Sequence, residues 1–354
     1  MQSKLVWGLF FVSLLVSSLS FAMMHDTRAL EADPFSQTEP IAPKLSGLGD
    51  YTFPVTTSIA ESQYFFNQGL RLTYAFNHSE ALRAFKEAVR LDPANAMAYW
   101  GWALVLGPNI NLPMQPYVRE QASEAIQKAS ELKSLVSKRE AAFIDALARR
   151  YSDDPSVTRP TLDRDYAEAM KGLVTKYPAD LDALTLYGAA LMNLSPWDYW
   201  HGDMSPKSNT NKILDAFESV LETDPRHPGA IHYYIHTVEL AQPKKAESYA
   251  DTLLDLMPGA GHMVHMPSHI YMRVGRYQDA YEVNKQASEV DERYIAQCKA
   301  QGVYPLNYYP HNLHFLVWAA MFQGKSKIAL EGARRVQEQM PLEMVKIFKL
   351  LEGF

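Results

Sequence analysis

Apolar and small residues recur along this chain at the three- and four-residue intervals of amphipathic helices. The clearest run has seven such positions, at Phe65, Gly69, Leu72, Ala81, Phe85, Ala88 and Pro93. Small residues at Gly69 and Ala81 would let two neighbouring helices approach closely, with Phe85 filling the space between them. Pro93 would end the second helix, because proline cannot continue an α-helix. The pattern predicts two helices that pack against each other across a short turn.

The same spacing returns further along the chain, at intervals of about 34 residues. Second helices that end at a proline are predicted over 166–178, 213–225, 246–258 and 329–341, with insertions at 107–111 and 195–208 and two ordinary amphipathic helices over 117–151. This pattern resembles the tetratricopeptide repeat, and the resemblance covers roughly residues 61–354. It implies an all-α fold, a right-handed superhelical solenoid of antiparallel helix pairs. The first helix of each pair would line a concave groove.

The N-terminal residues predict export. Lys4 precedes an apolar run from Leu5 to Met24, and Ser20-Phe21-Ala22 has the small–x–small form of a signal-peptidase site. We expect residues 1–22 to be a cleaved signal peptide, with an uncleaved membrane anchor as the alternative. The proline-punctuated residues 23–60 are expected to be an extended lead-in that lies on the domain surface or stays mobile. The predicted location is a periplasm or the cell exterior.

The C-terminal residues predict an interrupted repeat. After Pro341 a new first helix is expected to begin near Met344, and its apolar side would carry Ile347, Leu350, Leu351 and Phe354. An uncovered solenoid end exposes its apolar stacking surface. We therefore expect the solenoid, residues 61–354, to be truncated in the middle of a repeat or to be covered by a second copy. The alternative is a short helix folded back onto residues 329–336.

Composition narrows the possible functions. With 354 residues, of which 47% are hydrophobic, the chain has ample side chain to bury, which excludes general disorder. A formal net charge of −6 argues against recognition of nucleic acid through a basic surface. The one cysteine, Cys298, excludes an internal disulfide framework and a multi-cysteine zinc site.

Histidine is unevenly distributed, because eight of the eleven histidines fall between His227 and His314. Numbered within the repeats, seven of them occupy groove-facing positions of three successive first helices: His232, His236, His262, His265, His269, His311 and His314. At about 100° per residue, the histidines of each helix fall within an arc of about 60°. Adjacent first helices lie roughly 8–10 Å apart, so rings from the three helices can meet.

We interpret these seven residues as ligands of a transition metal, Cu, Zn or Fe. Neutral imidazole is the commonest metal ligand, and six rings could hold two ions as three plus three. Glu239, Tyr271 and Asn312 are candidate partners that would orient the rings. The alternative is that the histidines are hydrogen-bonded groove residues, or bind the carboxylates of a partner peptide. His232 and His236 have no glutamate between them, so the metalloprotease motif HExxH is absent.

The remaining histidines have simpler interpretations. His78 lies at a predicted helix start, where Asn77 would be the N-cap. His227 is expected to cap a turn. His25 and His201 are expected to be surface residues.

The repeats and the histidine segments together resemble a group of exported bacterial proteins known by their tetratricopeptide repeats, and this resemblance implies no particular reaction. Two functional classes stay open: a metal-dependent enzyme with a small-molecule substrate in the groove, or a scaffold that binds a peptide or protein there. No motif assigns a catalytic residue. A scaffold would use groove-facing side chains of the N-terminal repeats, such as Gln63, Phe66 and Tyr74. Membrane contact is expected only through an uncleaved N-terminal signal.

Overall fold

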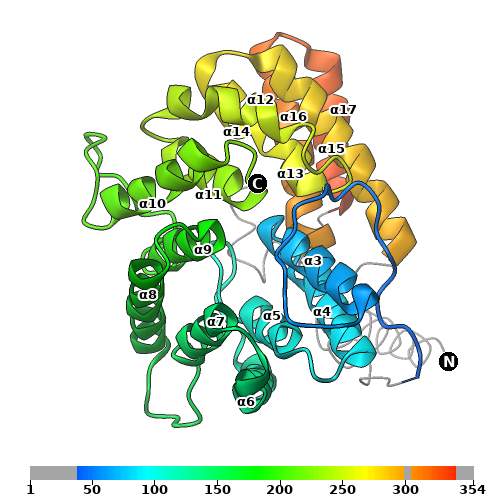
Figure 1. Cartoon of the computed structure of the whole chain (residues 1–354). Coiled ribbons are helices and arrows are strands. Elements are labelled where there is room, and N and C mark those ends of the chain that lie inside the picture. The colour runs from blue at the N-terminus through cyan, green and yellow to red at the C-terminus, as the bar shows by residue number, and fades with distance from the viewer. Residues whose placement is uncertain (1–37, 299–303, 340–354) are drawn as a thin grey trace, which may run out of the picture.

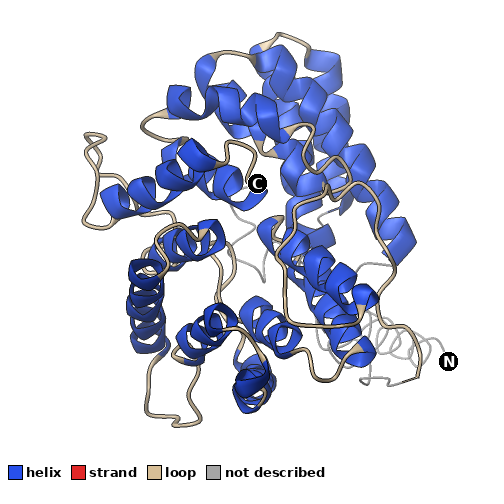
Figure 2. Cartoon of the chain, viewed as in Figure 1, coloured by secondary structure: helices blue, strands red, loops and turns tan. Residues whose placement is uncertain are grey.

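The computed structural model describes residues 38–298 and 304–339, and the regular structure in these ranges is helical. Helices joined by loops make up the described chain in Figures 1 and 2. Extended pairing within these ranges is limited to two isolated bridges, Asn109–Leu112 and Trp200–Pro206. The predicted all-α class is confirmed.

Helices follow one another with short connections. The N-terminal part contains α3 (Ala60–Tyr74), α4 (His78–Leu91), α5 (Ala96–Leu106), α6 (Arg119–Glu131), α7 (Lys138–Ala148), α8 (Arg159–Lys176), α9 (Leu181–Met192), α10 (Thr210–Thr223) and α11 (Pro228–Val238). The C-terminal part contains α12 (Glu247–Leu253), α13 (Gly261–His265), α14 (Pro267–Val274), α15 (Tyr277–Cys298), α16 (Tyr309–Phe322) and α17 (Ser326–Gln339). Neighbouring helices pack in pairs, and α3 also contacts α11, so the solenoid curves back on its own beginning (Figure 1).

Close packing within the pairs depends on glycines that face aromatic rings. A Cβ added to Gly69 would lie 2.8 Å from the Phe85 ring, and one added to Gly101 would lie 2.3 Å from the same ring. Gly188 faces Phe217 in the same way, at 2.5 Å. These interiors are close-packed, so a larger residue at any of the three positions would push two helices apart. The small position deduced for Gly69 is therefore confirmed.

Pro267 divides the segment with three of the histidines into α13 and α14. Proline has no N–H and therefore removes one helical hydrogen bond. Met266, between the two helices, keeps right-handed helical dihedrals, φ −50° and ψ −39°, and its carbonyl accepts a hydrogen bond from the His269 N–H at 3.1 Å. The break thus leaves the chain direction intact, and His262, His265 and His269 reach one cluster.

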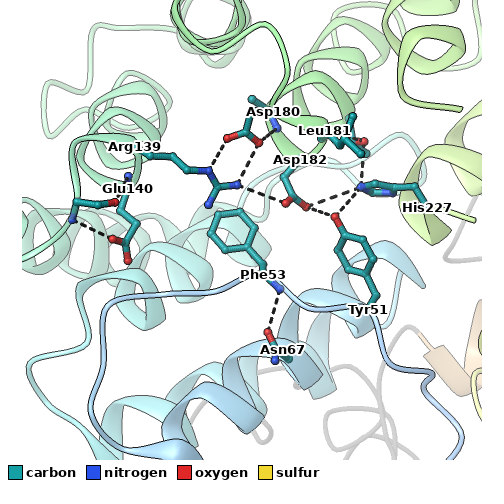
Figure 3. Close-up of polar contacts among 12 residues, drawn as sticks. Tyr51, Phe53, Asn67, Arg139, Glu140, Asp180, Leu181, Asp182 and His227 are labelled. Carbon is teal, nitrogen blue, oxygen red and sulfur yellow. Dashed lines mark hydrogen bonds and ion pairs between the residues drawn. The ribbon is translucent and has the colours of Figure 1, made fainter. Parts of the chain in front are cut away.

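Residues 38–59 form an extended segment, the strap, that packs on the helices and adds to their core. Phe53 of the strap is fully buried, and its ring packs against those of Phe66, Trp100 and Phe143. Figure 3 shows Arg139 beside Phe53. The guanidinium carbon lies 4.1 Å from the centre of the Phe53 ring. The strap is therefore packed against the helices through buried contacts.

Hydrogen bonds join the strap to helices that are far apart in the sequence. The Thr56 N–H donates to the Glu140 carboxylate of α7 at 2.6 Å. Near the other end of the strap, the Gly259 N–H, between α12 and α13, donates to the Gly47 carbonyl at 2.7 Å. The strap thus links early and late repeats across the curve of the solenoid.

The strap also occupies the N-terminal groove positions that a scaffold would use. The Gln63 amide donates to the Phe53 carbonyl at 2.9 Å, and its oxygen accepts from the Val55 N–H at 2.8 Å. Phe66 and Tyr74 are fully buried. These three side chains are therefore engaged within the chain.

Three of the sequence predictions lie outside the described residues: the signal peptide at 1–22, the first part of the lead-in at 23–37, and the interrupted repeat after Pro341. They stay predictions. Among the helices of the described ranges, none is long and apolar enough to cross a membrane.

Candidate metal centre

Six of the seven histidines predicted as ligands meet in one cluster, to which α11, α13, α14 and α16 contribute. They form two groups of three, and within each group the candidate ligand atoms lie within 4.8 Å of one another. The first triad is His232, His236 and His262, and the second triad is His265, His269 and His311. A third group, His236, Glu239 and His269, meets the same criterion and joins the two triads.

His314 lies outside both triads. It follows His311 by one turn on α16, but its ring packs on Trp318, with 4.3 Å between the ring centres. The predicted ligand role therefore has no geometric support at this position. His201 is exposed, as expected, and His25 lies outside the described residues.

In the first triad, two Nδ1 atoms have acceptors that fix the position of the ring proton. His232 Nδ1 lies 2.5 Å from the Tyr74 carbonyl oxygen, and His236 Nδ1 lies 3.0 Å from the Glu239 carboxylate. Because both acceptors lack a proton, each ring must donate from Nδ1 and leave Nε2 with a bare lone pair. His236 Nε2 is buried without a hydrogen-bond partner, and His262 Nε2 lies 3.1 Å from His232 Nε2.

The second triad repeats this arrangement. His265 Nδ1 lies 2.6 Å from the Asn284 side-chain oxygen, and His269 Nδ1 lies 2.6 Å from the Glu239 carboxylate. Both rings therefore carry their proton on Nδ1, yet their Nε2 atoms are 2.8 Å apart. His311 Nε2 lies 3.4 Å from His269 Nε2. Two lone pairs that face each other at this distance repel unless a cation lies between them.

Burial favours the neutral form of most triad rings. It lowers the pKa of five of them below the ordinary value for histidine, namely His232, His236, His262, His265 and His311. Desolvation disfavours the charged imidazolium, and the neighbouring rings add to the effect. Neutral imidazole is the form that binds metal, so protons compete weakly for these sites at neutral pH.

Glu239 is the one carboxylate in contact with both triads. Burial alone would raise its pKa, but the contacts with His269 and His236 hold the pKa of this carboxyl well below its usual range. The ionised carboxylate accepts one Nδ1–H from each triad. The cluster therefore places an ionised carboxylate beside five rings whose charged form is disfavoured by burial, which favours a cation.

Two strained residues place aromatic rings on the first triad. Phe76 has φ 56° and Trp197 has φ 63°, in the left-handed region that residues with a Cβ avoid. The Phe76 ring centre is 4.3 Å from that of His232 and 5.6 Å from that of His262. The Trp197 ring is 5.0 Å from that of His236. Strain of this kind persists where the surrounding structure requires a particular side-chain placement.

Of the three predicted ring partners, the structure brings only Glu239 to the histidines. The Tyr271 hydroxyl donates to Asp251 at 2.6 Å, and the Asn312 amide donates to Asp291 at 2.6 Å. Helix position alone suggested these two residues, and closer carboxylates take up their polar groups.

Sequence reasoning missed Asn284, which orients His265. Its amide nitrogen donates to the Ala280 carbonyl at 2.6 Å, so its oxygen is the atom that faces His265. A signal existed: Asn284 is fully buried on the same stripe of α15 as Ala280 and Ala287. A polar residue in an apolar stripe requires a buried partner.

Two further histidines lie at helix starts, as predicted, and one of them is the cap. The Asn77 side chain accepts from the Glu80 N–H at 3.3 Å, so His78 is the first residue of α4. His227 Nδ1 accepts from the Ala230 N–H at 3.1 Å at the start of α11.

Comparison with known proteins adds little to this geometry. No family model matches the sequence, and no curated protein matches it. Among solved structures, the chain is similar to the MamA RS-1 ArsTM double mutant, at 17% identity and a TM-score of 0.38, over 50% of this chain and 84% of that chain. The functional conclusion therefore rests on the geometry of the histidine cluster.

Proposed function

We propose that the two triads hold two transition-metal ions, each bound by three imidazole Nε2 atoms. The observation that carries the proposal is the pair of Nε2 atoms on His265 and His269, which lie 2.8 Å apart while their Nδ1–H groups are committed elsewhere. Ligands about 2.0–2.1 Å from a tetrahedral ion lie about 3.3 Å from one another. The separations of 3.1 Å and 3.4 Å elsewhere in the triads fit this spacing.

Three protein ligands leave a coordination position open on each ion. Structural zinc sites are closed by four protein ligands, whereas catalytic sites keep a position for water or substrate. The proposed centre is therefore that of a metal-dependent enzyme acting on a small molecule. Its expected export rests on residues 1–22 and is part of the same proposal.

The ligand set favours copper or zinc over iron. Non-haem iron sites combine two histidines with a carboxylate, whereas all-imidazole sites suit copper and zinc. The nearest carboxylate, Glu239, accepts the Nδ1–H groups of His236 and His269. An oxidative reaction would follow with copper, and a hydrolytic one with zinc.

A peptide scaffold is the alternative function, and the strap argues against it. The strap engages Gln63 and covers Phe66, so the N-terminal repeats offer no free groove at these positions. The side chains at these positions contact the strap and stabilise the fold instead.

Metal analysis of the purified full chain tests the proposal. After chelator treatment, the protein is incubated separately with copper, zinc and iron, desalted and analysed by mass spectrometry. We expect saturation at about two equivalents of copper or zinc. Saturation at one equivalent would contradict the two-ion centre. Retention below about a tenth of an equivalent of every metal would contradict metal binding altogether.

A further inference from the structure

A pocket on the far side of Phe76 from the first triad contains charged and polar groups that the metal centre does not use. Its lining includes Phe76, His78, Asn109, Arg150, Asn193 and Tyr233. Phe76 and Tyr233 form the wall shared with the triad, because their ring centres lie 4.3 Å and 5.5 Å from that of His232.

Arg150 is the charged group of this pocket. Its side chain is 4% exposed, and one guanidinium nitrogen donates to the Pro108 carbonyl at 2.6 Å. Its Nε is buried with no hydrogen-bond partner. The Asp163 carboxylate lies 3.8 Å from this same Nε, beyond hydrogen-bond distance, and forms a shorter contact with Arg159, at 3.0 Å. Two arginines thus share one carboxylate, which leaves a net positive charge beside the pocket.

An acceptor lies in the same pocket. The Asn193 amide nitrogen donates to the Pro108 carbonyl at 3.3 Å, while its side-chain oxygen is buried without a partner. A donor and an acceptor that are both buried and unpaired in one pocket are costly, because each has lost its hydration. A ligand with an anionic oxygen and a hydroxyl group would satisfy both.

The rest of the lining limits the charge of such a ligand. Apolar residues make up most of it, including Leu104, Ile110 and Leu186. Burial lowers the pKa of His78 to about 4, so this ring adds no positive charge at neutral pH. One uncompensated arginine matches a single negative charge, whereas a phosphate dianion would need further donors.

We propose that this pocket binds a small monocarboxylate, with Arg150 holding the carboxylate and Asn193 accepting a hydrogen bond from a hydroxyl group of the ligand. The site requires neither metal nor the triads, so it stands independently of the metal centre. Its position behind Phe76 places the ligand next to the first triad without contact with the ring nitrogens.

Isothermal titration of the chelator-treated full chain with lactate and with propionate, at constant ionic strength in chloride, tests the proposal. Lactate should bind saturably and more tightly than propionate, which lacks the hydroxyl. Arg150→Gln should weaken lactate binding by about tenfold or more, as expected for loss of a charged hydrogen bond. Arg149→Gln, at the exposed neighbouring position, should bind like the wild type.

Several results would overturn the proposal. One is that the wild type binds neither acid saturably. Another is that folded Arg150→Gln binds lactate as tightly as the wild type. Asn193→Ala provides a second variant in case Arg150→Gln does not fold. It should remove the difference between lactate and propionate, and a retained difference would refute the role given to Asn193.

Discussion

Two buried regions of this molecule contain histidine and use it in opposite ways. In the network around Asp182, both ring nitrogens of His227 have partners: Nδ1 accepts from a backbone N–H, and Nε2 lies 2.8 Å from the Tyr51 hydroxyl. In the triads, partners occupy Nδ1 of four rings, His262 Nδ1 is buried without a partner, and Nε2 atoms face one another. Burial of a histidine therefore does not by itself indicate metal binding. What distinguishes the two regions is whether the second ring nitrogen has a partner.

The Asp182 network fastens the strap to the solenoid. The Asp182 carboxylate accepts hydrogen bonds from the Tyr51 and Tyr74 hydroxyl groups, with oxygen–oxygen distances of 2.8 Å and 2.9 Å. Figure 3 shows Arg139 and His227 on the same carboxylate, at 3.5 Å and 3.8 Å. Every polar group in this set has a partner within the chain, so we expect it to contribute to stability rather than to ligand binding.

Acid should reveal the largest difference between the regions. Five triad rings have a pKa below the ordinary value, because burial disfavours their charged form. A lowered folded pKa gives stability that is present above about pH 6.5 and is lost as the pH falls, since the unfolded chain takes up those protons first. Each ring contributes up to about 1.4 kcal/mol per pH unit.

Buried acids with a raised pKa oppose this trend, and Glu80 is one of them. Burial raises the pKa of Asp291 to about 7, so its contribution to stability grows as the pH falls below that value. The contribution of Asp291 to the change of stability with pH offsets that of about one of the five rings. Metal-free protein should therefore unfold cooperatively between roughly pH 6.5 and 5 when followed by circular dichroism. A free energy of unfolding that stays constant from about pH 7.5 to 5.5 would contradict neutral burial of the rings.

Removal of the Asp182 carboxylate should have the next largest effect. Asp182→Ala leaves two buried tyrosine hydroxyls and Arg139 without their shared acceptor. Loss of one partner from a buried charged network costs about 3–5 kcal/mol. Urea unfolding at neutral pH should show this loss, while metal content should remain unchanged.

Asp215→Ala is the matched control for that variant, because Asp215 is exposed on α10. It should change stability by less than about 0.5 kcal/mol. A loss of metal in Asp182→Ala that is as large as its loss of stability would show that the two regions are not separate.

The sequence could predict those parts of the two regions in which residues recur at helical intervals. Six of the seven ligand candidates reach the cluster because i, i+3 and i, i+4 spacing fixes which residues share a helix face. His227 was assigned to a cap because it follows Asp224-Pro225 at the end of a repeat, and it is the N-cap of α11. In contrast, the strap has no period. No sequence pattern near these residues indicates that Phe53 is buried or that Tyr51 pairs with Asp182, 131 residues away.

Loss of a ligand tests the triads directly. His269→Ala should weaken metal binding by more than about a hundredfold, beyond the 10–100-fold cost of losing an outer partner. His265→Ala should behave in the same way, with helicity intact in both. His314→Ala on α16 and His201→Ala should bind metal like the wild type, because neither residue belongs to a triad. Equal metal affinity in all four variants would contradict the assignment.

The smallest predicted effect concerns Asn284, which the repeat pattern did not identify. Its oxygen accepts the His265 Nδ1–H at 2.6 Å and so aims Nε2 at the second triad. Asn284→Ala should weaken metal binding by about 10–100-fold, as loss of an outer partner does. Asn284→Asp keeps an acceptor at this position and should restore most of the affinity, which a purely structural role would not explain. Gln286→Ala, on the exposed side of α15, should have no effect. If Asn284→Asp binds metal as poorly as Asn284→Ala, the acceptor role is wrong, and Asn284 matters only for the packing of α15 against α13.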